Sequence, residues 1–451
     1  MTASPDPSPP AAGRADGPGL SDLRARLAAA EGPVWITVGT LLDGSSRAPW
    51  RDAHLVYDTG AIRHVGGPDH PPPRECLGPG RSEPHLRLPG WTVLPGLVDA
   101  HAHLVLEGGE TDPEHRRRHL RQSPPALLDD ARRRARRLVG LGVTAVRDAG
   151  DNKGVGLTLS RECRRAAAPG AAAPPLPWIE SPGPALHHRG SYGAFVGEAI
   201  EDHRSLVDCV ASRVHSGAQR IKLLVSGVID FELGRVDVPP QMSAEEVAAL
   251  AGAARARGRP VFAHASGPEG IGHALAGEIE SVEHGYFVTH EQLTRMRDRR
   301  IAWVPTFAPV QAQIDHAGAL GWRTPVIDQL RRILDDHARS LVHAAAIGVT
   351  VLAGSDAGSY GVPHGRGLLR ELALMERAGM GSLDVLSAAT GTSADHLELG
   401  EGWGRLRPGR GARFILTERS PLETVAHLDR DAVVVFDGQP VDPPDPSRPG
   451  L

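Results

Sequence analysis

Residues 93–106, VLPGLVDAHAHLVL, contain the pattern from which the fold and the site follow. The apolar run predicts a buried β-strand, and His101-Ala102-His103 stands where that strand ends. Because side chains alternate along a strand, the two imidazoles point to the same side. Two neighbouring imidazoles favour a metal site. The alternative at this point is a pair of hydrogen-bonded core histidines.

Length and composition indicate a globular protein with more than one core. The 451 residues exceed one small domain, and the net charge of -4 calls for neither nucleic acid nor an anionic membrane as partner. No apolar run is long enough to span a bilayer, and the N-terminus lacks the apolar segment of a secretory signal. Three scattered cysteines argue against a disulfide framework. We therefore predict a cytoplasmic enzyme.

The two ends of the chain differ from its middle. Residues 1–19 are rich in Pro, Ala and Gly without apolar periodicity, which predicts a disordered tail. Residues 33–95 and 401–445 hold short β runs between turn residues, and we expect one composite β-sandwich domain built from both chain ends. Residues 96–400 alternate eight strand candidates with helical stretches. This alternation predicts an α/β domain of the (β/α)8 TIM-barrel type.

Polar side chains stand at the ends of the predicted barrel strands. They are His101 and His103 on strand one, Lys222 on strand four, His264 on strand five, His284 on strand six and Asp356 on strand eight. Taken singly, each has a plainer explanation, such as a core histidine, a turn, a helix N-cap or a lysine that snorkels outward. Because the C-terminal strand ends of a barrel converge on one mouth, we expect these six side chains to meet there.

Five segments together resemble the metal-dependent amidohydrolase superfamily: GLVDAHAHL, RIKLLVSG, FAHASGPEG, SVEHG and GSDAG. They are most similar to the branch of imidazolonepropionase-like and Xaa-Pro dipeptidase-like enzymes, and the resemblance covers nearly the whole chain. It implies a hydrolase that holds two divalent metal ions. Zinc suits imidazole and carboxylate ligands best. Iron, cobalt or manganese would fit the same ligands.

The resemblance also implies how the metals are held. His101 and His103 would hold the more buried metal, and His264 and His284 would hold the second. Lys222 would be carboxylated by CO2, and the resulting carbamate would bridge the two metals. Only two of the 50 basic residues are lysines, and this one lies inside an apolar strand. Burial favours the neutral form of the lysine amine, and this form reacts with CO2. The guanidinium of arginine is more basic and does not react in this way.

The resemblance places Asp356 against the first metal and the bridging water. The metals would lower the pKa of that water toward neutrality and polarise the substrate carbonyl. Asp356 would take the proton from the attacking hydroxide and pass it to the leaving nitrogen as a general acid.

Further residues after the strands are candidates for substrate binding. His187, His188 and Tyr192 follow the predicted third strand, and we expect one of them to donate to the substrate carbonyl. The alternative is an ordinary exposed loop. Tyr286 and His364 follow strands six and eight and are predicted to line the pocket, the alternative being packing within the barrel.

The chain departs from these relatives in two places. The family often shows Ser-Gly-Gly after the strand-four lysine, whereas this chain has Ser226-Gly227-Val228, which indicates an altered pocket. Imidazolonepropionases and several deaminases place a Glu soon after the strand-five histidine. Here Glu269 comes five residues after His264, which disfavours both of those activities.

The leading hypothesis is a binuclear amidohydrolase that cleaves an amide-type C–N bond of a small molecule with a metal-activated hydroxide. A dipeptide or an N-acyl amino acid is the substrate closest to the resemblance. The alternative within the superfamily is a mononuclear deaminase or cyclic-amide hydrolase, which needs no carboxylated Lys222. A non-catalytic scaffold would have lost metal ligands, and all six are present. The resemblance is also compatible with a homo-oligomer.

Overall fold

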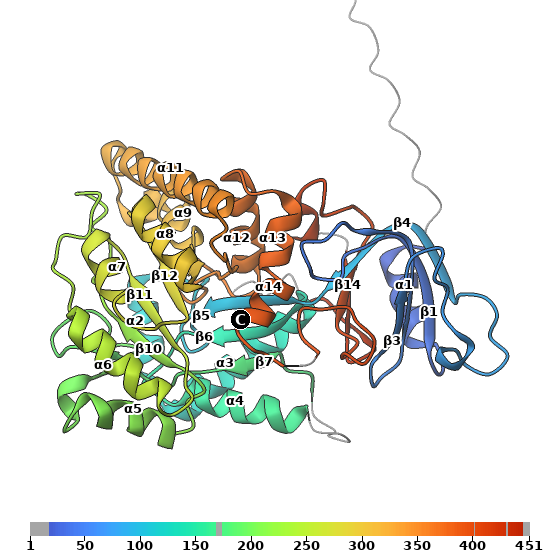
Figure 1. Ribbon diagram of the computed structural model, residues 1–451, viewed down its shortest axis with the longest axis horizontal. Helices are drawn as coiled ribbons and strands as arrows, with labels where there is room; N and C mark the ends of the chain where they lie inside the picture. Colours follow the sequence, from blue (N-terminus) through green and yellow to red (C-terminus); the bar gives the residue numbers. More distant parts are fainter. Residues whose placement is uncertain (1–17, 168–173, 401, 430–431, 445–451) are drawn as a thin grey trace, which may run out of the picture.

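The computed structural model describes residues 18–167, 174–400, 402–429 and 432–444. The tail predicted over residues 1–19 lies almost entirely outside these ranges. The described chain has a smaller β-rich part at one end and a larger part of strands and helices (Figure 1). No helix in the described ranges is both long enough and apolar enough to cross a membrane.

Both ends of the chain contribute to one seven-stranded sheet in the smaller part. Its order is β16-β15-β14-β4-β1-β2-β3. The strands are β1 (Val34–Leu41), β2 (Trp50–Tyr57), β3 (Ile62–Gly66), β4 (Leu86–Pro95), β14 (Phe414–Thr417), β15 (Ala432–Phe436) and β16 (Gln439–Val441). The described strands are hydrogen-bonded into one sheet, and the composite β-sandwich over residues 33–95 and 401–445 stays a prediction. Strand β4 joins the two chain ends, because it pairs in parallel with β1 on one side and antiparallel with β14 on the other.

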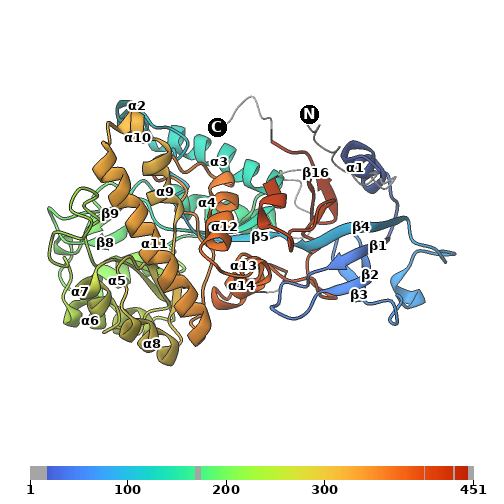
Figure 2. The same ribbon diagram turned by 90° about the horizontal axis from the view of Figure 1, so that it is seen from above.

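The core of this part joins the chain ends as well. Tyr57 of β2 packs edge-on against Phe414 of β14, with ring centroids 4.9 Å apart. Leu23 and Leu27 of helix α1 (Leu20–Ala28) belong to the same buried cluster. Strand β4 then runs directly into β5, the strand that carries His101, so the two parts share one continuous stretch of chain (Figure 2).

The larger part is built on parallel strands. One sheet has the order β5-β6-β7 and another the order β13-β12-β11-β10-β8-β9. The strands are β5 (Leu97–Ala102), β6 (Val143–Asp148), β7 (Trp178–Glu180), β8 (Ala185–His187), β9 (Gly197–Ala199), β10 (Ile221–Leu224), β11 (Val261–Ala265), β12 (Ser281–His284) and β13 (Ala302–Val304). Six of these strands are buried along their whole length: β5, β6, β10, β11, β12 and β13. Such burial is expected for strands that are covered on both faces.

Residues 350–356 lie between the outer strands of these two sheets. The Trp303 amide in β13 donates to the Thr350 carbonyl, and the Leu352 amide donates to the Trp303 carbonyl, each at 2.9 Å. On the other side, the amide of Ala100 in β5 donates to the Ala353 carbonyl at 2.8 Å. The segment that carries Asp356 is therefore bonded to both sheets.

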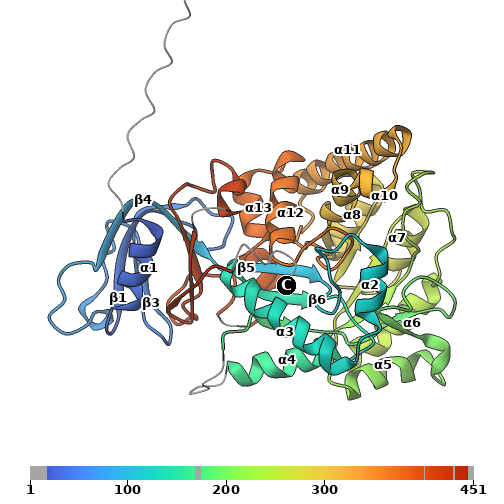
Figure 3. The ribbon, with the colours of Figure 1, turned by 180° about the vertical axis from the view of Figure 1, so that it is seen from behind.

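Helices surround the parallel strands (Figure 3). They are α2 (Pro113–Leu120), α3 (Pro124–Gly140), α4 (Val155–Ala166), α5 (Leu206–His215), α6 (Ala244–Arg255), α7 (Pro268–Ala274), α8 (His290–Arg299), α9 (Ala308–Asp315), α10 (Ala317–Leu320), α11 (Thr324–Ile347), α12 (Arg366–Arg377), α13 (Ser382–Ala388) and α14 (Gly391–His396). Short 3-10 turns span Arg74–Cys76, Ile200–Asp202 and Val425–Asp429. Capping boxes begin α6 at Ser243 and α8 at Thr289, and Gly348 in the left-handed conformation ends α11.

Candidate metal centre and active site

The ends of the parallel strands bring the six predicted ligands to one cavity. Its volume is about 330 Å³, and its lining includes His101, His103, Lys222, His264, His284 and Asp356. These residues come from β5 and the residue that follows it, from β10, β11 and β12, and from the segment 350–356, so the chain positions that meet span more than half of the sequence. The structure therefore brings all six together.

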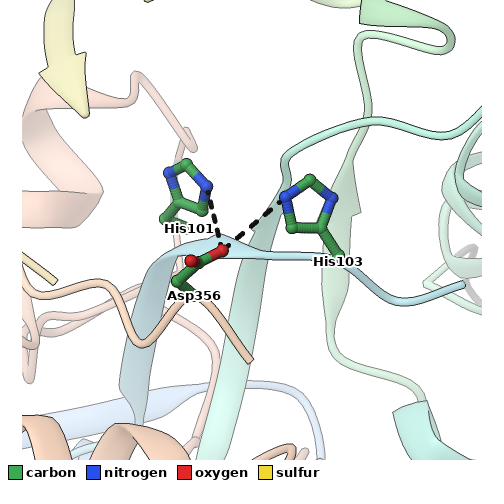
Figure 4. A group of neighbouring side chains, drawn as sticks. All are labelled: His101, His103 and Asp356. Carbon is green, nitrogen blue, oxygen red and sulfur yellow. Dashed lines mark ion pairs between the residues drawn. The ribbon is translucent and has the colours of Figure 1, made fainter. Parts of the chain in front are cut away.

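Three of the six form the tightest group. Nε2 of His101 lies 3.5 Å from Oδ1 of Asp356, and Nε2 of His103 lies 3.6 Å from the same oxygen. Figure 4 shows the carboxylate reaching toward both rings. The three potential ligand atoms all lie within 4.8 Å of one another. One cation could contact all three side chains.

The remaining imidazoles continue this group. The ring of His284 lies 5.0 Å from that of His101 and 4.6 Å from that of His264. Lys222 reaches the same cavity from β10, where it is one of the largest fully buried side chains. The arrangement is thus a row of four rings with a buried amine and a buried carboxylate.

Burial makes the histidines neutral. It is the largest cause lowering the pKa of His103 to about 4 and that of His264 to about 3, with the nearby Lys222 charge as the second cause. Burial also lowers the pKa of Lys222 to about 8 and raises that of Asp356 to about 7, the latter against a hydrogen bond from Ser359. A neutral imidazole is the form that binds a metal.

Each ring is held by one of its two nitrogens. Nδ1–H of His103 donates to the Gly150 carbonyl at 3.2 Å, and Nε2–H of His264 donates to the Gly227 carbonyl at 3.2 Å. Nδ1 of His284 pairs with the Thr306 hydroxyl at 2.7 Å. Hydrogen bonds of this kind fix the orientation of metal-binding histidines and leave the other nitrogen as the ligand.

Two polar atoms at the centre of the cavity lack hydrogen bonds. Across the described ranges, Nε2 of His101 and Nζ of Lys222 are buried without a hydrogen-bond partner. Buried polar atoms in native proteins are nearly always satisfied, so each such atom requires an explanation. Metal ligation at His101, and a modified amine at Lys222, would satisfy both. The residues present therefore fit a metal centre.

Two of these positions have a strained backbone. His284 has φ 66° and Asp356 has φ 53°, both in the left-handed region that non-glycine residues rarely occupy. Hydrogen bonds hold each in place: Nε1–H of Trp303 donates to the His284 carbonyl at 2.9 Å, and the Asp356 amide donates to the His101 carbonyl at 2.7 Å. Such strain is found preferentially at functional sites.

A buried ion pair behind His101 was not predicted from the sequence. Nδ1–H of His101 donates to Oε2 of Glu283 at 2.5 Å, and Arg147 binds both Glu283 oxygens at 2.8 Å. Nε–H of Arg147 also donates to the Ala100 carbonyl at 2.6 Å, and the arginine is fully buried. The available signal was an arginine inside the apolar strand VTAVRD, since a buried charge requires a partner.

The five predicted substrate residues fall into two groups. Tyr192 and Tyr286 line the cavity, and the ring of Tyr192 lies 5.3 Å from that of His264. The hydroxyl of Tyr286 donates to the Thr306 carbonyl at 2.9 Å, so its ring rather than its hydroxyl faces a ligand.

The other three lie outside the described lining of this cavity. His188 contacts Glu201 at 2.7 Å and Glu246 at 3.1 Å, and its carbonyl accepts from Nδ1–H of His187 at 2.8 Å. Nε2–H of His364 donates to the His103 carbonyl at 3.0 Å, which places it behind that ligand. A substrate role for these three histidines stays a prediction.

The comparisons with known proteins agree with this geometry. The family model described as "Amidohydrolase family" matches residues 92–441. The chain belongs to this family. It is therefore a hydrolase acting on carbon–nitrogen bonds, and the resemblance inferred from the five sequence segments is confirmed.

Two relatives have sequences similar to that of this amidohydrolase. An uncharacterised protein of Mycobacterium tuberculosis is 31% identical over 304 residues, covering 66% of this chain and 72% of that protein. Ochratoxinase of Aspergillus niger is 27% identical over 422 residues, covering 86% of this chain and 82% of its own length.

Solved structures share the fold. A Xaa-Pro dipeptidase with bound methionine superposes with a TM-score of 0.72 at 25% identity, over 91% of the amidohydrolase and 100% of that chain. The structure of A. niger ochratoxinase gives a TM-score of 0.72 at 24% identity, over 91% and 96% of the two chains.

Proposed function

We propose that this amidohydrolase holds two divalent metal ions, with zinc as the expected metal, and hydrolyses an amide-type C–N bond of a small molecule. His101, His103 and Asp356 would hold one ion, and His264 and His284 the other. Bound there, the metals would supply Lewis-acid activation of a water and of the substrate carbonyl.

The observation that carries the proposal is the convergence of the six side chains with two unsatisfied buried atoms among them. Nζ of Lys222 has no hydrogen-bond partner in the described ranges and lies in the same cavity as the four imidazoles. A neutral amine that attacks CO2 forms an N–C bond and releases a proton, which gives a carbamate. The carbamate would provide anionic oxygens where the four neutral rings leave positive metal charge uncompensated.

Asp356 is placed to move the proton. Its Oδ1 lies against both His101 and His103, and its Oδ2 accepts from the Ser359 hydroxyl at 2.8 Å. This hydrogen bond holds Oδ2 in place, and Oδ1 stays on the side of the two histidines. We infer that Asp356 takes a proton from the attacking water and delivers it to the leaving nitrogen.

The second candidate function is a mononuclear deaminase or cyclic-amide hydrolase. One observation favours it: His101, His103 and Asp356 alone form a group compact enough for one ion. Such an enzyme would use those three ligands and leave Lys222 unmodified.

We further infer that the two parallel sheets belong to one closed (β/α)8 barrel, spanning about residues 96–400 beside the composite β domain. Residues 350–356 would close it between β13 and β5. On the opposite side, β7 pairs with β6. Strand β8 begins five residues after the end of β7 and pairs with β10. One interrupted strand from β7 to β8 would thus join the sheets.

The resemblance implies a dipeptide or an N-acyl amino acid as the substrate, and one similar structure is described as a Xaa-Pro dipeptidase. The charge distribution of the cavity, described below, favours a different class of amide. The cytoplasmic location and a homo-oligomer stay predictions of the sequence.

Metal content per chain tests the proposal. The protein, expressed with zinc supplied, is analysed by elemental mass spectrometry after removal of loosely bound ions. We expect two equivalents. One equivalent would favour the mononuclear alternative, and none in a folded sample would overturn both and favour a scaffold.

A further inference from the structure

We propose that the substrate of this amidohydrolase is an uncharged amide with an apolar aromatic or aliphatic group, and not a free dipeptide or N-acyl amino acid. The proposal rests on the proposed hydrolase function and narrows its substrate. It follows from how charge is distributed over the cavity that holds the candidate metal ligands.

All charge in the cavity lies on its floor. The six candidate ligands are the only histidine, lysine, arginine, aspartate or glutamate residues among its described lining residues. The walls above them are apolar and are formed by Leu106, Phe195, Val196, Leu224, Val228, Ile229, Phe231, Pro309 and Val310, together with the rings of Tyr192, Tyr286 and Tyr360. The remaining polar lining residues, Ser266, Gln313 and Ser359, carry no charge.

The nearby cations are engaged elsewhere. Arg235, on the loop after β10, binds Asp237 at 2.7 Å and points to solvent with two thirds of its side chain exposed. Arg116 lies over the ring of the lining residue Tyr360, 6.0 Å from its centroid, but its guanidinium donates to the Gly358 carbonyl at 2.8 Å and is not part of the lining. A substrate carboxylate placed beyond the metals would therefore meet apolar walls.

Apolar side chains are exposed at the mouth of the cavity, in a stretch that also carries the exposed charged residues Glu232, Arg235 and Asp237. Seven large apolar side chains are exposed within the described ranges, and four of them belong to two segments, residues 192–196 and 227–242, which we call the rim. They are Phe195, Val228, Leu233 and Val238. Phe195 and Val228 line the cavity itself and remain 40% and 51% exposed. Clustered exposed apolar side chains mark binding surfaces.

The rim is structured. Asp230 and Arg235 form a β-bridge within it, and Phe231 packs edge-on against Trp322, with ring centroids 6.3 Å apart. An apolar wall held in place binds apolar groups by removing their surface from water. It disfavours a carboxylate, which would lose hydration without gaining a partner. The volume of about 330 Å³ is within the range of small-molecule sites.

A matched pair of substrates tests the proposal. The hexanoyl amides of 4-nitroaniline and of 5-amino-2-nitrobenzoic acid differ by one carboxylate, and each releases a coloured amine on hydrolysis. With the metal-loaded enzyme we expect kcat/KM for the uncharged amide to exceed that for the anionic amide by about tenfold or more. Equal or higher kcat/KM for the anionic amide would overturn the proposal while supporting hydrolase function.

A charge placed at the mouth provides the second arm. Val228→Arg adds a cation at an exposed lining position, and we expect it to reduce the preference for the uncharged amide to about threefold or less. Val342→Arg is the matched control, because Val342 is 44% exposed on α11 and does not line the cavity. An unchanged preference in Val228→Arg, or an equal shift in the control, would contradict the proposal.

Binding separates this proposal from the proposed function. The uncharged fluorophore N-phenyl-1-naphthylamine should bind the cavity and be displaced by the uncharged amide at lower concentration than by the anionic amide. Displacement without hydrolysis of either amide would contradict the hydrolase function and support the apolar site. Absence of probe binding, with neither amide hydrolysed, would overturn the apolar site.

Discussion

Nδ1–H of His101 donates to Oε2 of Glu283 at 2.5 Å, although the two residues are 182 positions apart in the sequence. Nη2 of the buried Arg147 guanidinium donates to both oxygens of Glu283, each at 2.8 Å. Carboxylates in this position orient a metal-binding ring and increase its basicity. Glu283 is therefore a positioning residue for His101.

Glu283→Gln should weaken metal binding without removing a ligand. The amide keeps an oxygen that can accept from His101, but it loses the negative charge that balances Arg147. We expect the metal dissociation constant to rise about 10- to 100-fold, measured by competition with a chromophoric chelator. Glu162→Gln is the control, since Glu162 pairs with Arg132 on the surface. Wild-type affinity in folded Glu283→Gln would contradict the positioning role.

Asp356→Asn should separate metal binding from turnover. The substitution keeps the shape and the Ser359 contact but removes the proton acceptor. We expect near wild-type metal content and a loss of kcat of about 10²- to 10⁴-fold. Asp315→Asn, which affects a surface pair with Arg370, should leave both unchanged. Full activity of Asp356→Asn would remove this residue from the mechanism.

Lys222→Arg should prevent formation of the carbamate that would help to hold the metals. Arginine keeps the positive charge but does not form a carbamate, so we expect about one metal or fewer per chain and no turnover. The chain offers a matched control in Lys153→Arg, the only other lysine, which should behave as wild type. A ¹³C NMR signal from a carbamate in protein equilibrated with ¹³CO2 should be present in the control and absent in Lys222→Arg. Two metals and normal turnover in Lys222→Arg would contradict the carbamate.

Residues that follow strand periodicity were the predictable part of the site. His101 lies in β5 and His103 directly follows its last residue, and parallel strand order then brings His264 and His284 beside them. The partner of Arg147 was not predictable in this way, because it depends on which strands lie opposite each other across the interior. Pattern alone also does not separate His364, which holds the backbone of His103, from a residue that lines the cavity.

The sheet at the chain ends shows the same limit. Short β runs between turn residues predict strands, but they do not specify which strands pair. The parallel pairing of β4 with β1 and its antiparallel pairing with β14 join both chain ends in one sheet. Such pairing is decided by long-range register, for which turn residues give no signal.

Glu371 should make stability depend on pH. This buried residue of α12 accepts from the amides of Phe307 and Ala308 at the start of α9, at 2.8 and 2.7 Å. Burial outweighs these hydrogen bonds and raises its pKa from 4.5 to about 8. The folded state then holds a proton that the unfolded state has lost between those values. Its contribution to stability is full below pH 4.5 and is lost as the pH rises through 8.

Glu371→Gln removes this titration, so the variant should be less stable than wild type at about pH 5.5 and should approach or exceed it at about pH 8. The difference in unfolding free energy should change by up to about 1.4 kcal/mol per pH unit, measured by urea denaturation of both proteins. Glu376→Gln on the same helix is the control. Hydrogen bonds to Thr424, Ser382 and Val425 lower the pKa of Glu376 despite partial burial, so it is already ionised throughout this range and its difference from wild type should stay constant. Parallel stability profiles for wild type and Glu371→Gln would show that Glu371 is ionised in the folded protein, and that its two amide contacts outweigh the cost of burial.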